Sequence, residues 1–534
     1  SCPVSQPAVV FYEFELLTLD QVCKLRPVKS SEIDILPAAA YQSVWPSLLP
    51  FVTTLINLSL MRGISPDSFK TSIIKPLLKS SDLDSNSLKS YRPVSDLSFI
   101  SKVLETTVKC QLLDHFQEHN LLHPNQSAYT PGHSVETALL DVYASLLSAL
   151  DSGKSAFLVM LDLSAAFDTI SHSKLLTILK SSFGIDGNVL SWIKSYLENR
   201  RFKVKTGTAF SEVKESNIGV PQGSVLGPVL FNCVMAGLPR ILESLGVKCH
   251  LYADDTQFVV TFDKGDEMSA RSKIIEIFAA IKAFMFENCL KLNASKTVFI
   301  PFSRYQTEFE PLQLDSEVSI PATYATRNLG VIFDSKLSFR SHISNVRKSA
   351  FNHLKRIQSV KSYIPKFMLE TLVHGFITSR VEFCNSLFFM LPNNSLNKLQ
   401  TVQNACARFL TGTKQRDSVK EECRNLHWLP VDRRIKFKLL LLAHKIIYPN
   451  SDNIVPDYLS SQIYVKSSAR FTRSSLGPIC EVPRSSLKTV GDRSFVSAIP
   501  NLWNQLPLSL RLNNSFNSFK NGLKTYYFKQ YYMC

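Results

Sequence analysis

Short apolar runs separated by polar turns predict β-strands in the middle of the chain. Residues 156–161 form an apolar run of strand length that ends at Asp162. Residues 249–260 are apolar at both ends and polar at the centre, which predicts a strand, a tight turn and a returning strand. The turn carries Asp254 and Asp255 side by side. We therefore expect two strands that each place a carboxylate at one end.

After about residue 335 the apolar period becomes that of a helix. One predicted helical face carries Ile343, Val346, Ala350, Leu354 and Ile357. Residues 358–372 and 396–410 have similar patterns. We expect no segment to reach the ~20 apolar residues that span a bilayer, and hence no membrane partner. The pattern predicts an α+β protein with a mainly helical C-terminal region.

The acidic positions suggest a metal site. Two adjacent aspartates at a turn repel each other, and a pair of divalent ions ~3.5–4 Å apart would relieve that repulsion. Asp162 could share the ions with Asp254 and Asp255 if the two strands are neighbours, which the sequence does not establish. A hydrophilic turn is the alternative for the aspartate pair. A helix N-cap is the alternative for Asp162.

A loop rich in glycine and proline lies between these acidic positions. Residues 219–228 contain three glycines and two prolines. Such a loop is rigid, and its backbone can approach a ligand closely. A plain connector is the alternative.

Three segments contain these acidic positions and the loop, and in chain order they read LDLSAAFD, GVPQGSVLGP and YADD. In this order they resemble the reverse transcriptases of LINE-type (non-LTR) retrotransposons. The similarity continues in FKTSIIKPLLK, SYRPVSDLSFISKVLE, HPNQSAYTPGHSVETALL, LKLNASKTVFI and TRNLGVIFD. The resemblance covers roughly residues 60–335. It implies an RNA-directed DNA polymerase, a nucleotidyltransferase that uses an RNA template, a DNA primer or target DNA, and deoxynucleoside triphosphates. A nicked chromosomal end would be the primer. The implied fold is a right hand with fingers, a palm built on an antiparallel sheet, and a thumb.

The resemblance also assigns the catalytic chemistry. Asp162, Asp254 and Asp255 match the carboxylates that hold two Mg²⁺ ions, with Mn²⁺ as an alternative. Lys296 matches a lysine that protonates the leaving pyrophosphate, and a solvated lysine is its alternative. Phe167 matches the aromatic residue that excludes a ribose 2′-hydroxyl, because its ring leaves no room for the extra oxygen. An ordinary core phenylalanine is the alternative for Phe167.

The remaining matches concern binding. Gln222 and Gly223 match the loop that contacts the nucleotide and the template. Arg92 matches a finger residue that could reach the triphosphate, although an arginine in a loop is more often a surface charge. Leu329 and Gly330 match the hairpin that grips the primer end.

Two departures from the family pattern leave room for a weakened copy. Ala128 and Tyr129 stand where the family usually has Gly-Phe, and alanine would be strained if the backbone there needs a positive φ. Ala236-Gly237 stands where Asn-Asp is common. The alternative function is therefore a decayed or co-opted copy that binds nucleic acid without catalysis.

Length and charge divide the chain. With 534 residues, more than one domain is expected. We predict an N-terminal extension (1–60), fingers and palm (61–335), a helical thumb (336–414) and a basic C-terminal region (415–534). The net charge of +16 indicates a polyanionic partner. Residues 1–334 have a net charge of −4, and residues 335–534 have +20. The split favours a nucleic-acid-holding thumb and tail over a merely solvated basic face.

The remaining features are weaker. Eleven cysteines without a Cys-x-x-Cys pair predict reduced thiols and an intracellular protein, in the nucleus and the cytoplasm. Cys423 and His427 could be half of a zinc site, but core or surface residues are the better interpretation. The Ser-rich stretch 467–475 predicts a flexible loop. We expect the chain to be the C-terminal portion of a longer polyprotein, without the upstream endonuclease domain.

Overall fold

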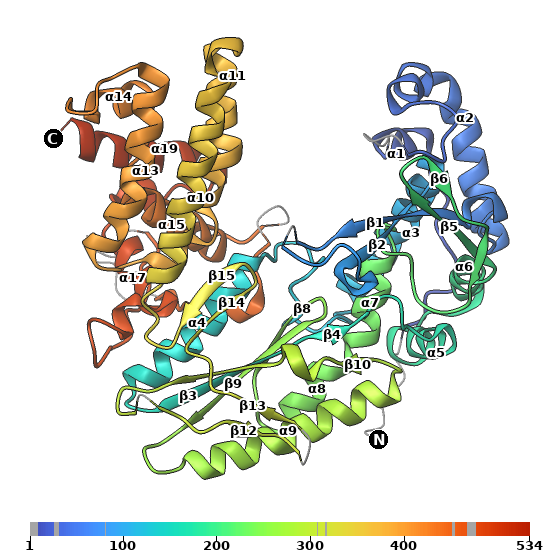
Figure 1. Ribbon diagram of the computed structural model, residues 1–534, viewed down its shortest axis with the longest axis horizontal. Helices are drawn as coiled ribbons and strands as arrows, with labels where there is room; N and C mark the ends of the chain where they lie inside the picture. Colours follow the sequence, from blue (N-terminus) through green and yellow to red (C-terminus); the bar gives the residue numbers. More distant parts are fainter. Residues whose placement is uncertain are drawn as a thin grey trace.

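The computed structural model of the chain describes residues 9–25, 31–80, 82–306, 308–315, 318–450, 454–466 and 477–533. The fold is mixed α+β with a helical C-terminal region, which confirms the coarse prediction from the sequence. A central sheet forms the base, and two arms rise from it on opposite sides (Figure 1). The Ser-rich stretch 467–475 lies outside the described residues.

The central sheet has four antiparallel strands in the order β11-β3-β9-β8. They are β3 (Ser155–Leu161), β8 (Cys249–Tyr252), β9 (Asp255–Phe262) and β11 (Val298–Phe302). Strand β3 is central, and successive side chains point to opposite faces. Leu158 belongs to one hydrophobic cluster, whereas Phe157 and Val159 belong to another. Burial on both faces explains why β3 is an unbroken apolar run.

Helix α4 (Val135–Asp151) packs against β3 and β9 from one side. Its residues share the hydrophobic cluster of Leu158. Helix α9 (Glu267–Glu287) contacts β9, and its buried residues share the cluster of Phe157. Helices α8 (Gly237–Ser244) and α9 lie below the sheet in Figure 1.

The arm on the right of Figure 1 is built from residues on both sides of β3. Its sheet has the order β2-β1-β5-β6, with β7 also paired to β5, and β1 runs parallel to β5. The strands are β1 (Thr71–Leu78), β2 (Tyr91–Asp96), β5 (Arg200–Thr206), β6 (Ala209–Phe210) and β7 (Lys214–Ser216). The helices are α1 (Leu19–Lys24), α2 (Ala38–Arg62), α3 (Phe99–Glu118), α5 (His172–Phe183) and α6 (Gly187–Leu197), and α7 (Gly227–Met235) leads back to the base.

Helix α2 corrects the expectation that no segment could span a bilayer. By length and composition, Ala38–Arg62 is apolar enough to do so. The core helices of soluble proteins can have the same length and composition. One side of α2 buries Trp45, Ile56 and Leu60 in the arm, whereas Phe51 is 75% exposed.

Three two-stranded sheets complete the strands of the described residues. They are β4 (Leu163–Ser164) with β10 (Lys291–Leu292), β12 (Leu312–Gln313) with β13 (Ser319–Ile320), and β14 (Ala325–Asn328) with β15 (Val331–Asp334). The hairpin β14–β15 lies directly before the helical arm in sequence.

The helical arm, on the left of Figure 1, begins after residue 335. Its helices are α10 (Arg340–Ser359), α11 (Lys366–Val373), α12 (Ser379–Glu382), α13 (Asn393–Thr411), α14 (Lys420–Asn425), α15 (Val431–Ile447), α16 (Asp457–Ser460), α17 (Phe495–Asn504), α18 (Leu508–Arg511) and α19 (Phe516–Tyr532). The arm's buried residues form one continuous cluster with α4, β3 and β15. Cys423 is buried in this cluster, where burial raises the pKa of its thiol, consistent with a core residue.

Candidate active site

The register of the central sheet brings the predicted carboxylates together. Leu161 is paired with Thr256 across β3 and β9, so Asp162 and Asp255 follow at the same end of neighbouring strands. Tyr252 is paired with Asp255, which closes a turn formed by Ala253 and Asp254. The adjacency of the two strands, which the sequence left open, is thus present in the structure.

Burial and, after it, repulsion between carboxylates raise the pKa of Asp254 and Asp255. Burial, followed by the charge of Asp162, raises the pKa of Asp254 above its ordinary value. Burial, followed by the charges of Asp254 and Asp162, raises the pKa of Asp255 to about 6. Carboxylates that are hard to ionise together favour a cation beside them. Lys296 supplies one, because its Nζ lies 2.6 Å from Oδ2 of Asp162.

The donor set fits a divalent metal in its chemistry. Carboxylate oxygens are the ligands that Mg²⁺ and Mn²⁺ prefer, and here three carboxylates meet at one end of a sheet. As the side chains lie, no His, Cys, Asp or Glu group of three or more is arranged to hold an ion within the described part of the chain. In this arrangement the carboxylate of Asp162 is paired with the ammonium group of Lys296.

Gln126 holds the turn, a role that the sequence analysis did not assign. Its Oε1 accepts hydrogen bonds from the backbone N–H of Ala253 at 3.0 Å and of Ala128 at 3.1 Å. Its Nε2 donates to the carbonyl of Ala253 at 3.4 Å. Ala253 has a φ of 58°, so this amide pair stabilises an unfavourable backbone conformation beside Asp254. A polar residue inside the phrase HPNQSAYT was the available signal.

The condition for strain at Ala128, a positive φ, is not met in the structure. The next residue, Tyr129, has a φ of 60° and adopts the left-handed conformation, whereas Ala128 does not. Alanine is therefore tolerated at 128, and the strain belongs to the following residue. Tyr129 lies near the cluster, since burial and then the charge of Asp254 raise the pKa of its phenol.

The predicted nucleotide-binding residues lie around the loop at 219–223. The ring of Phe167 stacks on Phe231 with centroids 4.8 Å apart, so Phe167 is also a packing residue. Gln222 donates from Nε2 to Oδ2 of Asp168 at 2.9 Å. Asp168 is half-buried, and burial raises the pKa of its carboxyl. In this structure the side chain of Gln222 is thus engaged within the protein.

The same loop packs tightly on β2. The carbonyl of Gln222 accepts from Ser95 N–H at 2.6 Å. Gly223 has a φ of 105°, and a Cβ there would lie 2.8 Å from the carbonyl oxygen of Ser95, so glycine is required. Arg92, also on β2, is exposed, and its charge lowers the pKa of Asp254 against the larger effect of burial. The loop therefore joins β2 to the base beside the carboxylates.

Leu329 and Gly330 form the turn between β14 and β15, with φ values of 45° and 93°. A Cβ on Gly330 would lie 3.1 Å from the ring of Phe383. Asn328, at the edge of this turn, donates from Nδ2 to Oε1 of Gln257 on β9 at 2.6 Å. Both residues are buried. The hairpin is therefore tied to the strand that begins at Asp255.

The central sheet, the carboxylate turn and the glycine loop all lie within one domain that comparison with known proteins identifies. Residues 78–333 match the family described as reverse transcriptase (RNA-dependent DNA polymerase). This part of the chain is a reverse transcriptase domain homologous to those of non-LTR retrotransposons, which confirms the resemblance seen in the sequence.

Three relatives illustrate the similarity. The probable RNA-directed DNA polymerase from transposon X-element of Drosophila melanogaster is 26% identical over 384 residues, which cover 71% of this chain and 42% of that protein. The probable polymerase from transposon BS of the same organism is 25% identical over 402 residues, covering 73% and 44%. The polymerase from mobile element jockey of Drosophila funebris is 26% identical over 403 residues, covering 73% and 43%. These alignments extend beyond residues 78–333, and the chain spans less than half the length of these relatives.

Proposed function

We propose that the chain is the polymerase portion of a non-LTR retrotransposon protein, which copies an RNA template into DNA from a DNA primer. The adjacency of Asp162 and Asp255 on paired strands, with Asp254 in the turn beside them, carries this proposal. Three crowded carboxylates suit a cation-dependent reaction better than a hydrophilic turn. As the sequence resemblance to non-LTR retrotransposon polymerases implies, the primer would be a nicked chromosomal DNA end.

The right-hand division follows from the same proposal. The sheet of β3, β8, β9 and β11 would be the palm, and the arm containing β1, β2 and β5 would be the fingers. The helices of residues 336–414 would be the thumb, followed by a basic C-terminal region at 415–534. The extension predicted at 1–60 would pack onto the fingers, because one side of α2 is buried in the hydrophobic cluster of that arm. This division is supported by the two arms that rise from the central sheet (Figure 1).

The proposed chemistry is nucleotidyl transfer. Asp162, Asp254 and Asp255 would hold two Mg²⁺ ions, or Mn²⁺. When bound, such ions lower the pKa of the primer 3′-hydroxyl and stabilise the charge on the leaving pyrophosphate. The primer 3′-hydroxyl would lose its proton to solvent water, its oxygen would bond to the α-phosphorus of the incoming nucleotide, and the bond from that phosphorus to pyrophosphate would break. Lys296, released from Asp162, would give a proton to the pyrophosphate.

The surrounding residues would position the substrates. Arg92, exposed near Asp254, would bind the triphosphate. Phe167 would pack against the sugar, and its stacking on Phe231 would fix the ring that rejects a 2′-hydroxyl. Gln222 and Gly223 would contact the nucleotide and template, and the turn at Leu329-Gly330 would hold the primer end.

Primer extension tests the proposal. The purified chain is given an RNA template, an annealed DNA primer, the four deoxynucleotides and Mg²⁺, and a matched reaction contains a DNA template. Extension on RNA that disappears when Asp162→Asn replaces the wild type supports the function. Nucleic-acid binding without extension in Mg²⁺ or Mn²⁺ would instead support the decayed or co-opted copy.

A further inference from the structure

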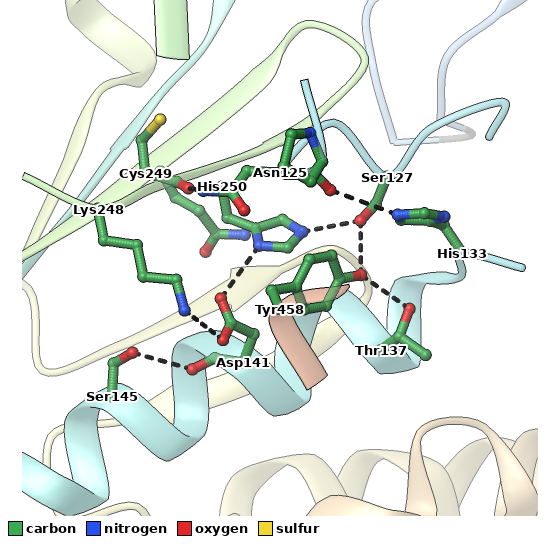
Figure 2. Close-up of polar contacts among 12 residues, drawn as sticks. Asn125, Ser127, His133, Thr137, Asp141, Ser145, Lys248, Cys249, His250 and Tyr458 are labelled. Atoms are coloured by element: carbon green, nitrogen blue, oxygen red, sulfur yellow. Dashed lines mark hydrogen bonds and ion pairs between the residues drawn. The ribbon is translucent and has the colours of Figure 1, made fainter. Parts of the chain in front are cut away.

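A buried polar cluster joins parts of the chain that are far apart in sequence (Figure 2). It contains Ser127, Thr137 and Asp141, with His250 from β8 and Tyr458 from α16. Each of these five residues is at most 6% exposed. Buried polar groups at this density need a complete set of partners to be tolerated.

The hydroxyl of Tyr458 is the centre of the cluster. It donates to Oγ1 of Thr137 at 3.1 Å and lies 2.8 Å from Oγ of Ser127. Oγ of Ser127 also lies 2.8 Å from Nε2 of His250, whose ring packs edge-on against Tyr458 with centroids 4.7 Å apart. Burial raises the pKa of Tyr458 to about 12, so its hydroxyl keeps its proton and can donate.

Asp141 closes the other side of the cluster. Its carboxylate lies 3.4 Å from Nδ1 of His250, 2.6 Å from Nζ of Lys248, and accepts from Nε2 of Gln462 at 2.9 Å. Burial raises the pKa of Asp141, but the contacts with His250 and Lys248 outweigh burial and hold that pKa below its ordinary value. Tyr458 and Gln462 thus bring the C-terminal region into both ends of the cluster.

Ser127, His250 and Asp141 resemble a hydrolytic triad in composition, but they are not arranged as one. A nucleophilic serine must reach a substrate, and Ser127 is 1% exposed with its hydroxyl engaged by Tyr458. The arrangement is therefore structural in its immediate contacts.

Those contacts lead to the catalytic turn. Ser127 N–H donates to the carbonyl of Leu251 at 2.9 Å, and Leu251 N–H donates to the carbonyl of Asn125 at 2.9 Å. Asn125 donates from Nδ2 to the carbonyl of Cys249 at 2.9 Å. Gln126, between these anchors, makes the amide pair that holds Ala253. The cluster thereby fixes the segment from which the turn is held.

We propose that Tyr458 and Gln462 are positioning residues of the polymerase site, through which the C-terminal region braces residues 125–127 and β8 and so holds Asp254 and Asp255 in place. The inference rests on the proposed function for its kinetic consequences, but the brace itself can be tested without catalysis. Residues 415–534 then contribute to chemistry as well as to binding.

The kinetic test compares two tyrosines in the full chain. Tyr458→Phe removes one hydroxyl and keeps the ring, whereas Tyr464→Phe makes the same change at a residue that is 68% exposed. For Tyr458→Phe we expect kcat of primer extension to fall about 10-fold, with a several-fold rise in the Mg²⁺ concentration for half-maximal rate. The KM for template–primer should change less than about 2-fold, because no phosphate contact is lost. Equal kcat and Mg²⁺ dependence in the two variants would overturn the proposal.

The structural test uses amide hydrogen exchange over residues 249–256. Tyr458→Phe, and separately Gln462→Met, should speed exchange in this segment relative to wild type and Tyr464→Phe, while segments that do not touch the central sheet, such as α2, stay unchanged. A uniform increase throughout the chain would indicate general destabilisation and contradict the brace, as would no change at 249–256. This readout separates failure of the brace from failure of the proposed polymerase activity, which wild-type extension reports.

A double-mutant cycle provides the final check. Ser127→Ala and Tyr458→Phe remove the two ends of one hydrogen bond, so their effects on kcat should be strongly non-additive. We expect the kcat of the double variant to lie within about 2-fold of the kcat of the slower single variant. Full additivity would mean that the two hydroxyls act independently, which the proposal does not allow.

Discussion

Residues 1–334 and the helical arm carry net charges of opposite sign, but part of the central sheet shares one hydrophobic cluster with the arm. Residues 1–334, which hold the carboxylates, have a net charge of −4, and residues 335–534 have +20. The buried residues of the helical arm nevertheless continue without a break into α4 and β3. We infer that the basic residues that bind nucleic acid and the carboxylates that perform the chemistry lie in different parts of the sequence. Packing of the helical arm on the central sheet holds these two parts together. Removing the arm would expose this shared core, so point variants in the full chain are the appropriate tests.

The largest effect should follow from the carboxylate turn. Asp255→Asn removes a charged ligand from the cluster, and we expect primer extension to fall by about 1,000-fold or more, because metal-assisted charge stabilisation contributes several kcal/mol. Affinity for template–primer should change less than about 2-fold. Rapid-quench extension and filter binding on the same preparations measure both.

Asp263→Asn is the matched control for that variant. Asp263 follows the other end of β9, where it pairs with Lys154 at 3.2 Å, and it is well exposed. It should behave as wild type. Comparable losses in the two variants would mean that the turn has no special role.

Loss of the turn's support should have the next largest effect. Gln126→Leu keeps approximate size but removes both hydrogen bonds to Ala253, leaving buried backbone groups unpaired. We expect kcat to fall about 10- to 100-fold, since an unsatisfied buried group costs ~1–3 kcal/mol. Circular dichroism should show a folded protein. Wild-type kinetics in a folded Gln126→Leu variant would show that the amide pair does not position Asp254.

Phe167→Ala should change selectivity more than rate. Removal of the ring opens space beside the sugar, so we expect the preference for deoxynucleotides over ribonucleotides to fall about 10-fold or more. Competition between the two nucleotides in primer extension measures this preference. Phe231→Leu is the comparison, because it disturbs the stacking partner without removing the ring of Phe167. Unchanged selectivity in Phe167→Ala would leave Phe167 as a packing residue.

The smallest effect concerns pH. Since the pKa of Asp255 is about 6 in the metal-free protein, protons compete with Mg²⁺ there as the pH falls through 6, and more Mg²⁺ should be needed for half-maximal rate. Because this folded-state pKa is raised, acidification also relieves repulsion in the folded state. The metal-free Asp255→Asn variant should melt above wild type at pH 7, and the difference should narrow toward pH 5. A difference that is constant with pH would argue against this assignment.

The strands and turns that match the family motifs could be predicted from the sequence. Fewer of the contacts that hold these strands and turns in place could be predicted. The strand that ends at Asp162 and the Asp254-Asp255 turn were predictable because short apolar runs bounded by acidic turns are local patterns. Their adjacency was not predictable without the resemblance, since strand pairing is a long-range property.

The contacts that support the turn could not be predicted from the sequence, because they too join residues far apart in the chain. Gln126 stabilises the turn through backbone groups more than a hundred residues away, and Tyr458 reaches Ser127 across 331 residues. Helix α2 was misjudged because two prolines and scattered polar residues concealed a span that is apolar on average. Helix α10 was predictable, because its buried residues keep a regular period on one face.

A salt titration tests most directly whether the carboxylate turn supplies the chemistry while the basic helical arm binds nucleic acid. Arg347, Lys348, Lys355 and Arg356 are exposed on α10, and their joint replacement by glutamine is compared with Asp255→Asn in extension and binding assays across salt. We predict that the α10 variant loses affinity and flattens the plot of log K against log salt by ~0.7–0.9 for each phosphate contact, while its rate at saturating template–primer stays near wild type. Asp255→Asn should keep the wild-type slope and lose the rate. An unchanged slope in the α10 variant, or retained extension in Asp255→Asn, would contradict the account.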